Sequence, residues 1–135
     1  MVLAVALVGC KHKCEEDGGE VNAAIDSEGL ALEGYEVCGW MTETSEAEHF
    51  SKLYYPKYIS ELVVEYVPHM EKQGWERVGC PGGNHYGPDD GLKDECFTKE
   101  GRLAKLHFYD FGHHVLGVIP RDGTVVDLAL DVKLP

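Results

Sequence analysis

The sequence has no run of about 20 apolar residues, the length that a helix needs to cross a bilayer, so we expect no transmembrane helix. Basic residues are also scarce: 12 Lys and Arg stand against 24 Asp and Glu, which gives a net charge of -12. Nucleic-acid binding needs Lys and Arg to displace the counterions of phosphates, and docking on anionic lipids needs the same charges. We therefore expect no nucleic-acid partner and no electrostatic binding to a membrane.

The chain also lacks the short motifs that mark common catalytic and nucleotide-binding sites. It contains no G-x-x-x-x-G-K-[ST], H-E-x-x-H, G-x-S-x-G or G-x-G-x-x-G. The acidic residues at Asp89, Asp90 and Asp94 do not have the alternating spacing of a calcium loop. The sequence therefore favours a protein that is not an enzyme, and we predict no cofactor.

The chain begins with a short apolar stretch, Val2 to Val8, which ends in Leu7-Val8-Gly9-Cys10. These residues resemble a bacterial lipobox, in which the cysteine is acylated and becomes the mature N-terminus. A signal peptide normally has a basic start and about 15 or more residues, whereas nine residues, none of them basic, precede Cys10. We therefore interpret residues 1–10 as a truncated, lipobox-like signal segment with Cys10 as a lipidation candidate. The alternative is that Val2 to Val8 form a first β-strand.

Acidic and small residues dominate the segment from Lys11 to Gly29. Residues 1–48 carry a net charge of -9, and residues 49–135 carry only -3. A segment this acidic and this poor in apolar groups buries too little surface to offset its chain entropy. We expect residues 11–29 to form a flexible tether and residues 30–135 to form the folded domain, with a lipid on Cys10 as the only membrane attachment.

The five cysteines bear on the compartment of the protein. If Cys10 is lipidated, Cys14, Cys38, Cys80 and Cys96 remain, and four cysteines allow three pairings. Because Cys14 falls in the predicted tether, we expect a bridge among the other three. Disulfides persist in oxidising compartments, so this interpretation favours the periplasmic side of the bacterial cell envelope. The alternative is a reduced cytoplasmic protein with buried thiols.

One amphipathic helix is predicted between Ser60 and Gly74. Ser60 is a favourable N-cap, because its hydroxyl accepts from an N–H of the first turn. Gly74 suits the left-handed position that ends many helices, and Pro68 predicts a kink. The apolar residues recur at three- and four-residue spacing and share one face: Leu62, Val63, Tyr66, Val67 and Met70.

Strands are predicted on both sides of this helix, with glycine-containing turns between the later ones. No helix separates these later strands, so the sheet should be antiparallel. The predicted fold is α+β, with one amphipathic helix packed on a mainly antiparallel sheet in a two-layer sandwich of approximate order ββαβββββ. In the last strand, Val126, Leu128, Leu130 and Val132 should face the helix. The predicted strands are Tyr35–Trp40, His49–Tyr55, Trp75–Val78, Glu95–Thr98, Arg102–Tyr109, His114–Ile119 and Thr124–Val132.

The helix from Ser60 to Met70, the following Gly74-Trp75-Glu76 and the strands after it resemble a helix-Gly-Trp-strand module of small bacterial lipoproteins. That resemblance covers about Tyr54 to Val132. It implies an α+β domain in the cell envelope and no catalytic residue, and it agrees with a packing role for Trp75.

Four residues are binding candidates on chemical grounds: Cys80, His85, His107 and His113. An imidazole near a thiol lowers the thiol pKa, so the alternative function is a soluble thiol- or metal-dependent protein that uses Cys80, His85 and other Cys and His residues. No metal is specified by these spacings. The favoured hypothesis is a non-enzymatic, envelope-tethered domain that binds a protein or a small ligand.

Overall fold

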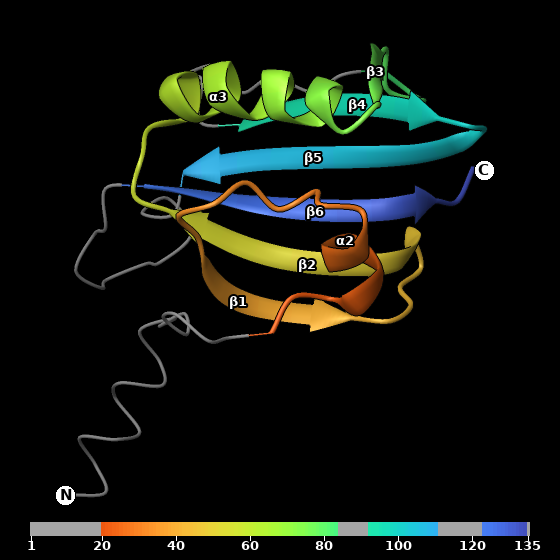
Figure 1. Cartoon of the computed structure of the whole chain (residues 1–135), viewed down its shortest axis with the longest axis horizontal. Helices are drawn as coiled ribbons and strands as arrows, with labels where there is room; N and C mark the ends of the chain where they lie inside the picture. The colour runs from red at the N-terminus through yellow and green to blue at the C-terminus, as the bar shows by residue number, and fades with distance from the viewer. Residues whose placement is uncertain (1–19, 84–91, 111–122, 135) are drawn as a thin grey trace, which may run out of the picture.

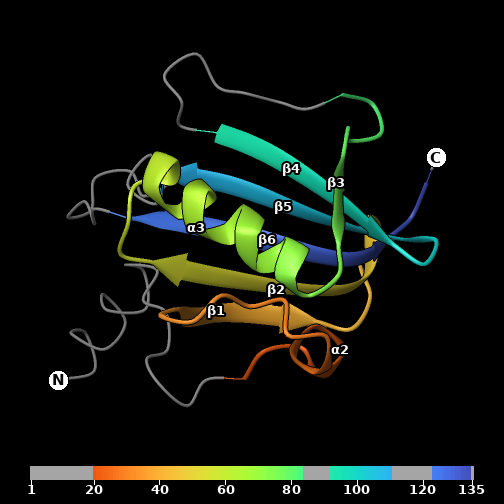
Figure 2. The same ribbon diagram turned by 45° about the horizontal axis from the view of Figure 1, so that its top comes forward.

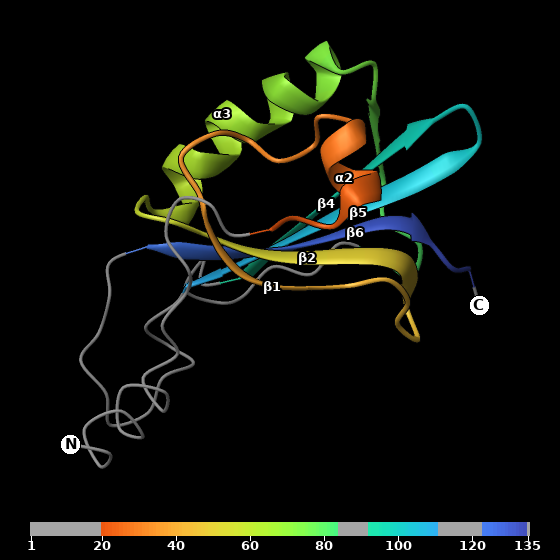
Figure 3. The same ribbon diagram turned by 60° about the horizontal axis from the view of Figure 1, so that its bottom comes forward.

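The computed structural model describes residues 20–83, 92–110 and 123–134. Over these residues the chain forms one six-stranded antiparallel sheet with two helices on the same side of it (Figures 1 and 3). The predicted class, α+β with a helix packed on an antiparallel sheet, is confirmed. The elements are α2 (Ala23–Ser27), β1 (Glu36–Met41), β2 (Ala47–Tyr55), α3 (Ile59–Lys72), β3 (Glu76–Val78), β4 (Leu92–Lys99), β5 (Arg102–Asp110) and β6 (Thr124–Val132).

The strand order is β1-β2-β6-β5-β4-β3, so the last strand lies inside the sheet. β6 pairs with β2 on one side and with β5 on the other. The short β3 pairs only with β4, at the edge opposite β1. Figure 2 shows α3 lying across the sheet, where it contacts β3, β4 and β5. The predicted strand His114–Ile119 lies outside the described residues.

The core lies between α3 and one face of the sheet. Leu53 of β2 pairs with Val126 of β6, and Leu106 of β5 pairs with Leu128 of β6. All four side chains are fully buried. The alternation predicted for β6 is confirmed: Val126, Leu128 and Leu130 are buried in the core, and Val132 is partly buried.

The start of α3 differs from the prediction, because Tyr58 and not Ser60 is the N-cap. Tyr58 has an extended backbone, and its N–H is accepted by the carboxylate of Glu61 at 3.3 Å. Ile59 is already helical and its side chain is buried. Burial of this apolar residue thus moves the helix start ahead of the serine that local capping preference favours.

The end of α3 agrees with the prediction at Gly74, which has a φ of 93°. The N–H of Trp75 donates to the carbonyl of Met70 at 3.1 Å, and the N–H of Gly74 donates to the carbonyl of Glu71 at 2.9 Å. This pair of bonds is a Schellman motif, and it delivers Trp75 into the core. The helix includes Pro68, whose side chain is exposed.

The predicted flexible tether was too long. Residues 20–29 belong to the folded domain, because they contain α2 and the fully buried side chain of Ile25. Asn22 caps this helix: its side-chain oxygen accepts from the N–H of Ala24 at 3.0 Å. Composition misleads here because the segment does not fold alone. One buried apolar side chain and one capping amide are enough to fix it against a packing surface that the rest of the domain supplies. Residues 11–19 lie outside the described part of the chain.

Two tyrosines hold the segment that joins α2 to β1. The hydroxyl of Tyr66, on α3, donates to the carbonyl of Leu30 at 2.8 Å and accepts from the N–H of Leu32 at 3.3 Å. The hydroxyl of Tyr55, on β2, donates to the carbonyl of Leu32 at 2.7 Å. The N-terminal segment is thereby fixed to both layers of the domain.

Replacing Tyr66 with Phe is expected to lower the free energy of unfolding by about 1–3 kcal/mol, because the buried carbonyl of Leu30 loses its donor. Urea denaturation measures this effect. Tyr58→Phe is the matched control: this side chain is 61% exposed, and the change should stay within about 0.5 kcal/mol. Equal midpoints for the two variants would contradict the hydrogen bonds of Tyr66.

Alkaline pH should destabilise the fold through the same tyrosines. Burial raises the pKa of Tyr66 to about 12, and burial together with the nearby Tyr66 raises the pKa of Tyr55 well above its ordinary value. A phenol whose folded-state pKa is raised contributes stability that is complete below its unfolded pKa, about 10, and is lost as the pH rises through the folded value. We expect the free energy of unfolding to fall above about pH 10, and to fall less steeply in Tyr66→Phe. Phenolate absorbance and circular dichroism, followed together, measure this. Ionisation of every tyrosine near pH 10 in a folded protein would contradict it.

Candidate functional site

Cys80 and Cys96, two of the predicted disulfide candidates, form a disulfide with their Cα atoms 5.1 Å apart. Cys80 follows β3, Cys96 lies in β4 opposite Val78, and both are buried. This confirms one of the pairings that the sequence left open and excludes bridges from Cys38 to either residue. The sulfur of Cys80 is not a free thiol, so its predicted role as a reactive or metal-binding thiol is wrong in this structure.

Cys38, in β1, is also disulfide-bonded. Its partner lies outside the described residues, as do three other predicted sites: the lipidation candidate Cys10 and the binding candidates His85 and His113.

His107, the remaining predicted site residue, belongs to a polar row on the sheet face opposite the helices. The row runs across four strands as Asp94, His107, Asp127 and Lys52, each directly opposite the next. Nδ1 of His107 hydrogen-bonds the carboxylate of Asp94, whose side chain is 1% exposed. Nζ of Lys52 lies 2.7 Å from the carboxylate of Asp127 and donates to the hydroxyl of Tyr109 at 2.5 Å.

The polar side chains of this row hydrogen-bond one another. Burial lowers the pKa of Lys52, but its hydrogen bonds to Asp127 and Tyr109 more than offset this, and the net pKa is raised. Burial likewise raises the pKa of Tyr109. Lys52 therefore stays protonated and Tyr109 stays a neutral phenol at neutral pH. A ligand that binds here would have to displace the hydrogen bonds among Lys52, Tyr109 and Asp127. The row therefore stabilises the sheet surface and is the weaker candidate for a binding site.

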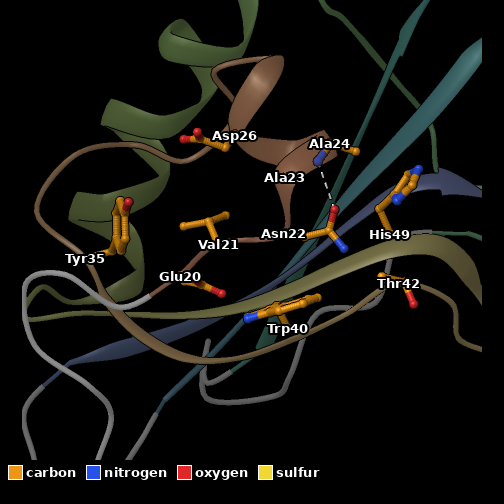
Figure 4. A pocket seen from close by; sticks show the side chains of 10 residues that line it. All are labelled: Glu20, Val21, Asn22, Ala23, Ala24, Asp26, Tyr35, Trp40, Thr42 and His49. Carbon is orange, nitrogen blue, oxygen red and sulfur yellow. Dashed lines mark hydrogen bonds between the residues drawn. The ribbon is translucent and has the colours of Figure 1, made fainter.

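A pocket of about 710 Å³ lies between the N-terminal segment and strands β1 and β2 (Figure 4). Its volume is within the range of small-molecule sites. The sequence prediction missed it, because six of its ten lining residues lie in the predicted tether. The lining residues are Glu20, Val21, Asn22, Ala23, Ala24, Asp26, Tyr35, Trp40, Thr42 and His49.

Asn22 anchors the N-terminal wall of this pocket. Besides capping α2, its side-chain amide donates to the carbonyl of Met41 at 2.6 Å. Its backbone N–H donates to the hydroxyl of Ser51 at 3.0 Å. These bonds cross from the N-terminal segment to β1 and β2, so the wall is held in place without a ligand.

Two aromatic rings line the pocket on the sheet side. Trp40 is 44% exposed, whereas tryptophan is highly buried on average. Tyr35 packs edge-on against the buried Tyr55, with ring centroids 6.4 Å apart. The sequence signal that marked this site is Trp40 itself, which stands in a predicted strand without an assigned role.

An ion-pair network fixes the far end of α2 to the sheet. The guanidinium of Arg102 binds both carboxylate oxygens of Asp131, at 2.8 and 3.1 Å, and the carboxylate of Glu28 at 3.0 Å. Nε2 of the pocket residue His49 lies 3.7 Å from the same Asp131. Asp131 has a φ of 58°, a left-handed conformation that aspartate adopts more readily than most residues other than glycine. The network thereby connects the end of α2 to strands β5 and β6, next to the pocket residue His49.

Residues 20–83, 92–110 and 123–134 contain neither a metal-binding cluster nor a membrane-spanning helix. No group of three or more His, Cys, Asp or Glu side chains there is arranged to hold a metal ion. Neither helix described there has the length and apolar character needed to cross a membrane.

Comparisons with known proteins give no relative for this chain. No protein-family model matches it, and no curated protein and no solved structure is significantly similar to it.

Proposed function

We propose that this chain is a non-enzymatic binding domain of the bacterial cell envelope, tethered through a lipid on Cys10, and that it binds a small ligand in the pocket beside Trp40. The pocket carries this proposal. Its wall is fixed by the hydrogen bonds of Asn22 and by the network of Arg102, and it exposes a large aromatic ring to solvent. Such preorganisation reduces the entropic cost of binding.

The envelope setting rests on separate observations. Leu7-Val8-Gly9-Cys10 resembles a lipobox. The Cys80–Cys96 disulfide and the further disulfide of Cys38 are typical of proteins from oxidising compartments.

Anchoring is tested by expressing the full chain behind a bacterial signal sequence, with Cys10→Ser as the matched control. Mass spectrometry should find an acyl modification on Cys10. The native chain should then fractionate with the membrane, and the Cys10→Ser variant, which cannot carry the lipid, should be found in the soluble fraction. Peptide mapping without reduction adds a second readout: a bridge from Cys38 to Cys14 is compatible with the lipid. A bridge from Cys38 to Cys10, or an unlipidated chain that fractionates with the cytosol, would overturn the anchoring.

Ligand binding is tested by a small-molecule screen that follows amide and indole NMR signals. Hits should shift the indole signal of Trp40 and the signals of His49, and Trp40→Ala should abolish their binding. Val64→Ala is the control, because this residue is 72% exposed on α3, away from the pocket lining. Hits that cluster around His107 instead would overturn the pocket and favour the polar row.

The alternative, a soluble thiol- or metal-dependent protein, has less support. It needs Cys80 as a thiol, and this residue is paired with Cys96. Bound metal in the oxidised protein, detected by elemental analysis, would revive it.

A further inference from the structure

We propose that the pocket beside Trp40 selects an organic ammonium cation. This inference rests on the proposed function, because it names the ligand class of the same pocket. It combines three observations: the acidic charge of the lining, the exposed ring of Trp40, and the arrangement of rings and carboxylates around the pocket.

The charged lining is acidic. Glu20 and Asp26 contribute carboxylates, and no Lys or Arg is among the lining residues. Both carboxylates are exposed, and neither has an ion-pair partner in the described part of the chain. The nearby cation Arg102 is committed to Asp131 and Glu28. A ligand of positive charge would therefore meet two exposed carboxylates that form no ion pair within the described residues, in a chain whose net charge is -12.

The two tryptophans of the chain differ in what covers their rings. Trp75 is buried, and both Lys99 and Arg102 lie over its ring, 6.0 and 5.9 Å from the centroid. Within residues 20–83, 92–110 and 123–134, no cationic side chain lies over Trp40, which is 44% exposed. The face of an indole attracts cations more strongly than other aromatic rings. A bound ammonium group would give Trp40 the contact that Trp75 already has.

The lining gathers two aromatic rings and two carboxylates around one open pocket. In Figure 4, Trp40 and Glu20 lie at the bottom of the pocket, Tyr35 at its left and Asp26 at its top, with Val21 and Asn22 in the middle. The amide of Asn22 is used by Ala24 and Met41, so the polar groups that face a ligand are the two carboxylates, the Thr42 hydroxyl and the His49 imidazole. Aromatic faces next to negative charge favour a cation with an apolar surface.

The test compares two probes of nearly equal shape, choline and its uncharged carbon analogue 3,3-dimethylbutan-1-ol, by the NMR signal of the Trp40 indole. Choline should bind about tenfold more tightly or better, since a cation–π contact and two exposed ion pairs together approach 1.4 kcal/mol. Its affinity should fall as ionic strength rises, whereas that of the neutral analogue should not.

Variants separate the contributions. Glu20→Gln with Asp26→Asn should weaken choline about threefold, and Trp40→Leu at least about threefold, because it also removes apolar contact. Glu71→Gln with Glu76→Gln is the matched control: it changes the net charge equally but lies on α3 and β3, and β3 is at the sheet edge opposite β1. It should leave choline affinity nearly unchanged.

Each outcome is decisive. Equal binding of the two probes, or a choline affinity that the Glu20/Asp26 variant leaves intact, would overturn the cation selectivity while leaving ligand binding in this pocket standing. No effect of either probe on Trp40 would overturn the cation proposal. If other screen compounds also spare the Trp40 and His49 signals, the proposed pocket function falls with it.

Discussion

Replacing Trp75 with Ala is expected to lower the free energy of unfolding by about 3–5 kcal/mol, the largest effect of any single substitution proposed for this chain. The side chain is 2% exposed and belongs to the main core cluster. It also follows the Schellman motif that ends α3, so its contacts link the helix to β3. Guanidinium or thermal denaturation, monitored by circular dichroism, measures the loss.

Two further variants make this prediction specific. Trp75→Phe should cost less, because it keeps an aromatic ring in the core and Nε1 of Trp75 has no hydrogen-bond partner to lose in the described part of the chain. Trp40→Ala removes the other tryptophan, which is 44% exposed, and should change stability by at most about 0.5 kcal/mol. Similar losses for Trp40→Ala and Trp75→Ala would contradict the assignment of one ring to the core and the other to the pocket.

Removing the Cys80–Cys96 disulfide by the double substitution to Ala is expected to cost about 2–4 kcal/mol, since the bridge closes a loop with a sequence separation of 16. The bridge fastens the end of β3, a strand of three residues that pairs only with β4. Without it the edge of the sheet next to Trp75 should open more easily. Denaturation curves and hydrogen exchange of the β3 and β4 amides measure the two consequences.

A reducing agent provides the control for this prediction. Reduction should destabilise the native chain by at least as much as the double substitution. The residual effect of reduction on the double variant reports the separate bridge of Cys38. Native-like stability of the double variant would show that the bridge adds nothing to the packing of β3.

Periodic and local signals were sufficient for much of the fold. The apolar face of α3 follows from the spacing of Leu62, Tyr66 and Met70, which are all fully buried, and its end follows from Gly74. The β4–β5 and β6 strands follow from alternation and from a glycine in the turn. These predictions succeeded because each depends on residues close together in the chain.

The site could not be predicted in the same way. His107 was predicted as a binding candidate on a strand, but its neighbours Asp94, Asp127 and Lys52 come from three other strands. The pocket joins residues 20–26 to Trp40 and His49, and nothing local indicates that Asn22 bonds Met41 and Ser51. The helix start was misplaced for a related reason: burial of Ile59 outweighed the capping preference of Ser60.

The sequence by itself determined the α+β class, the helix with its buried face and glycine stop, most of the strands, and the acidic character of the chain. Only the tertiary structure decided the strand order, the pairing of Cys80 with Cys96, the inclusion of residues 20–29 in the domain, and the pocket beside Trp40. The physical reason is the distance along the chain over which each kind of interaction acts. Hydrophobic periodicity and turn chemistry act over a few residues, whereas strand neighbours, disulfide partners and pocket walls depend on which distant segments bury one another.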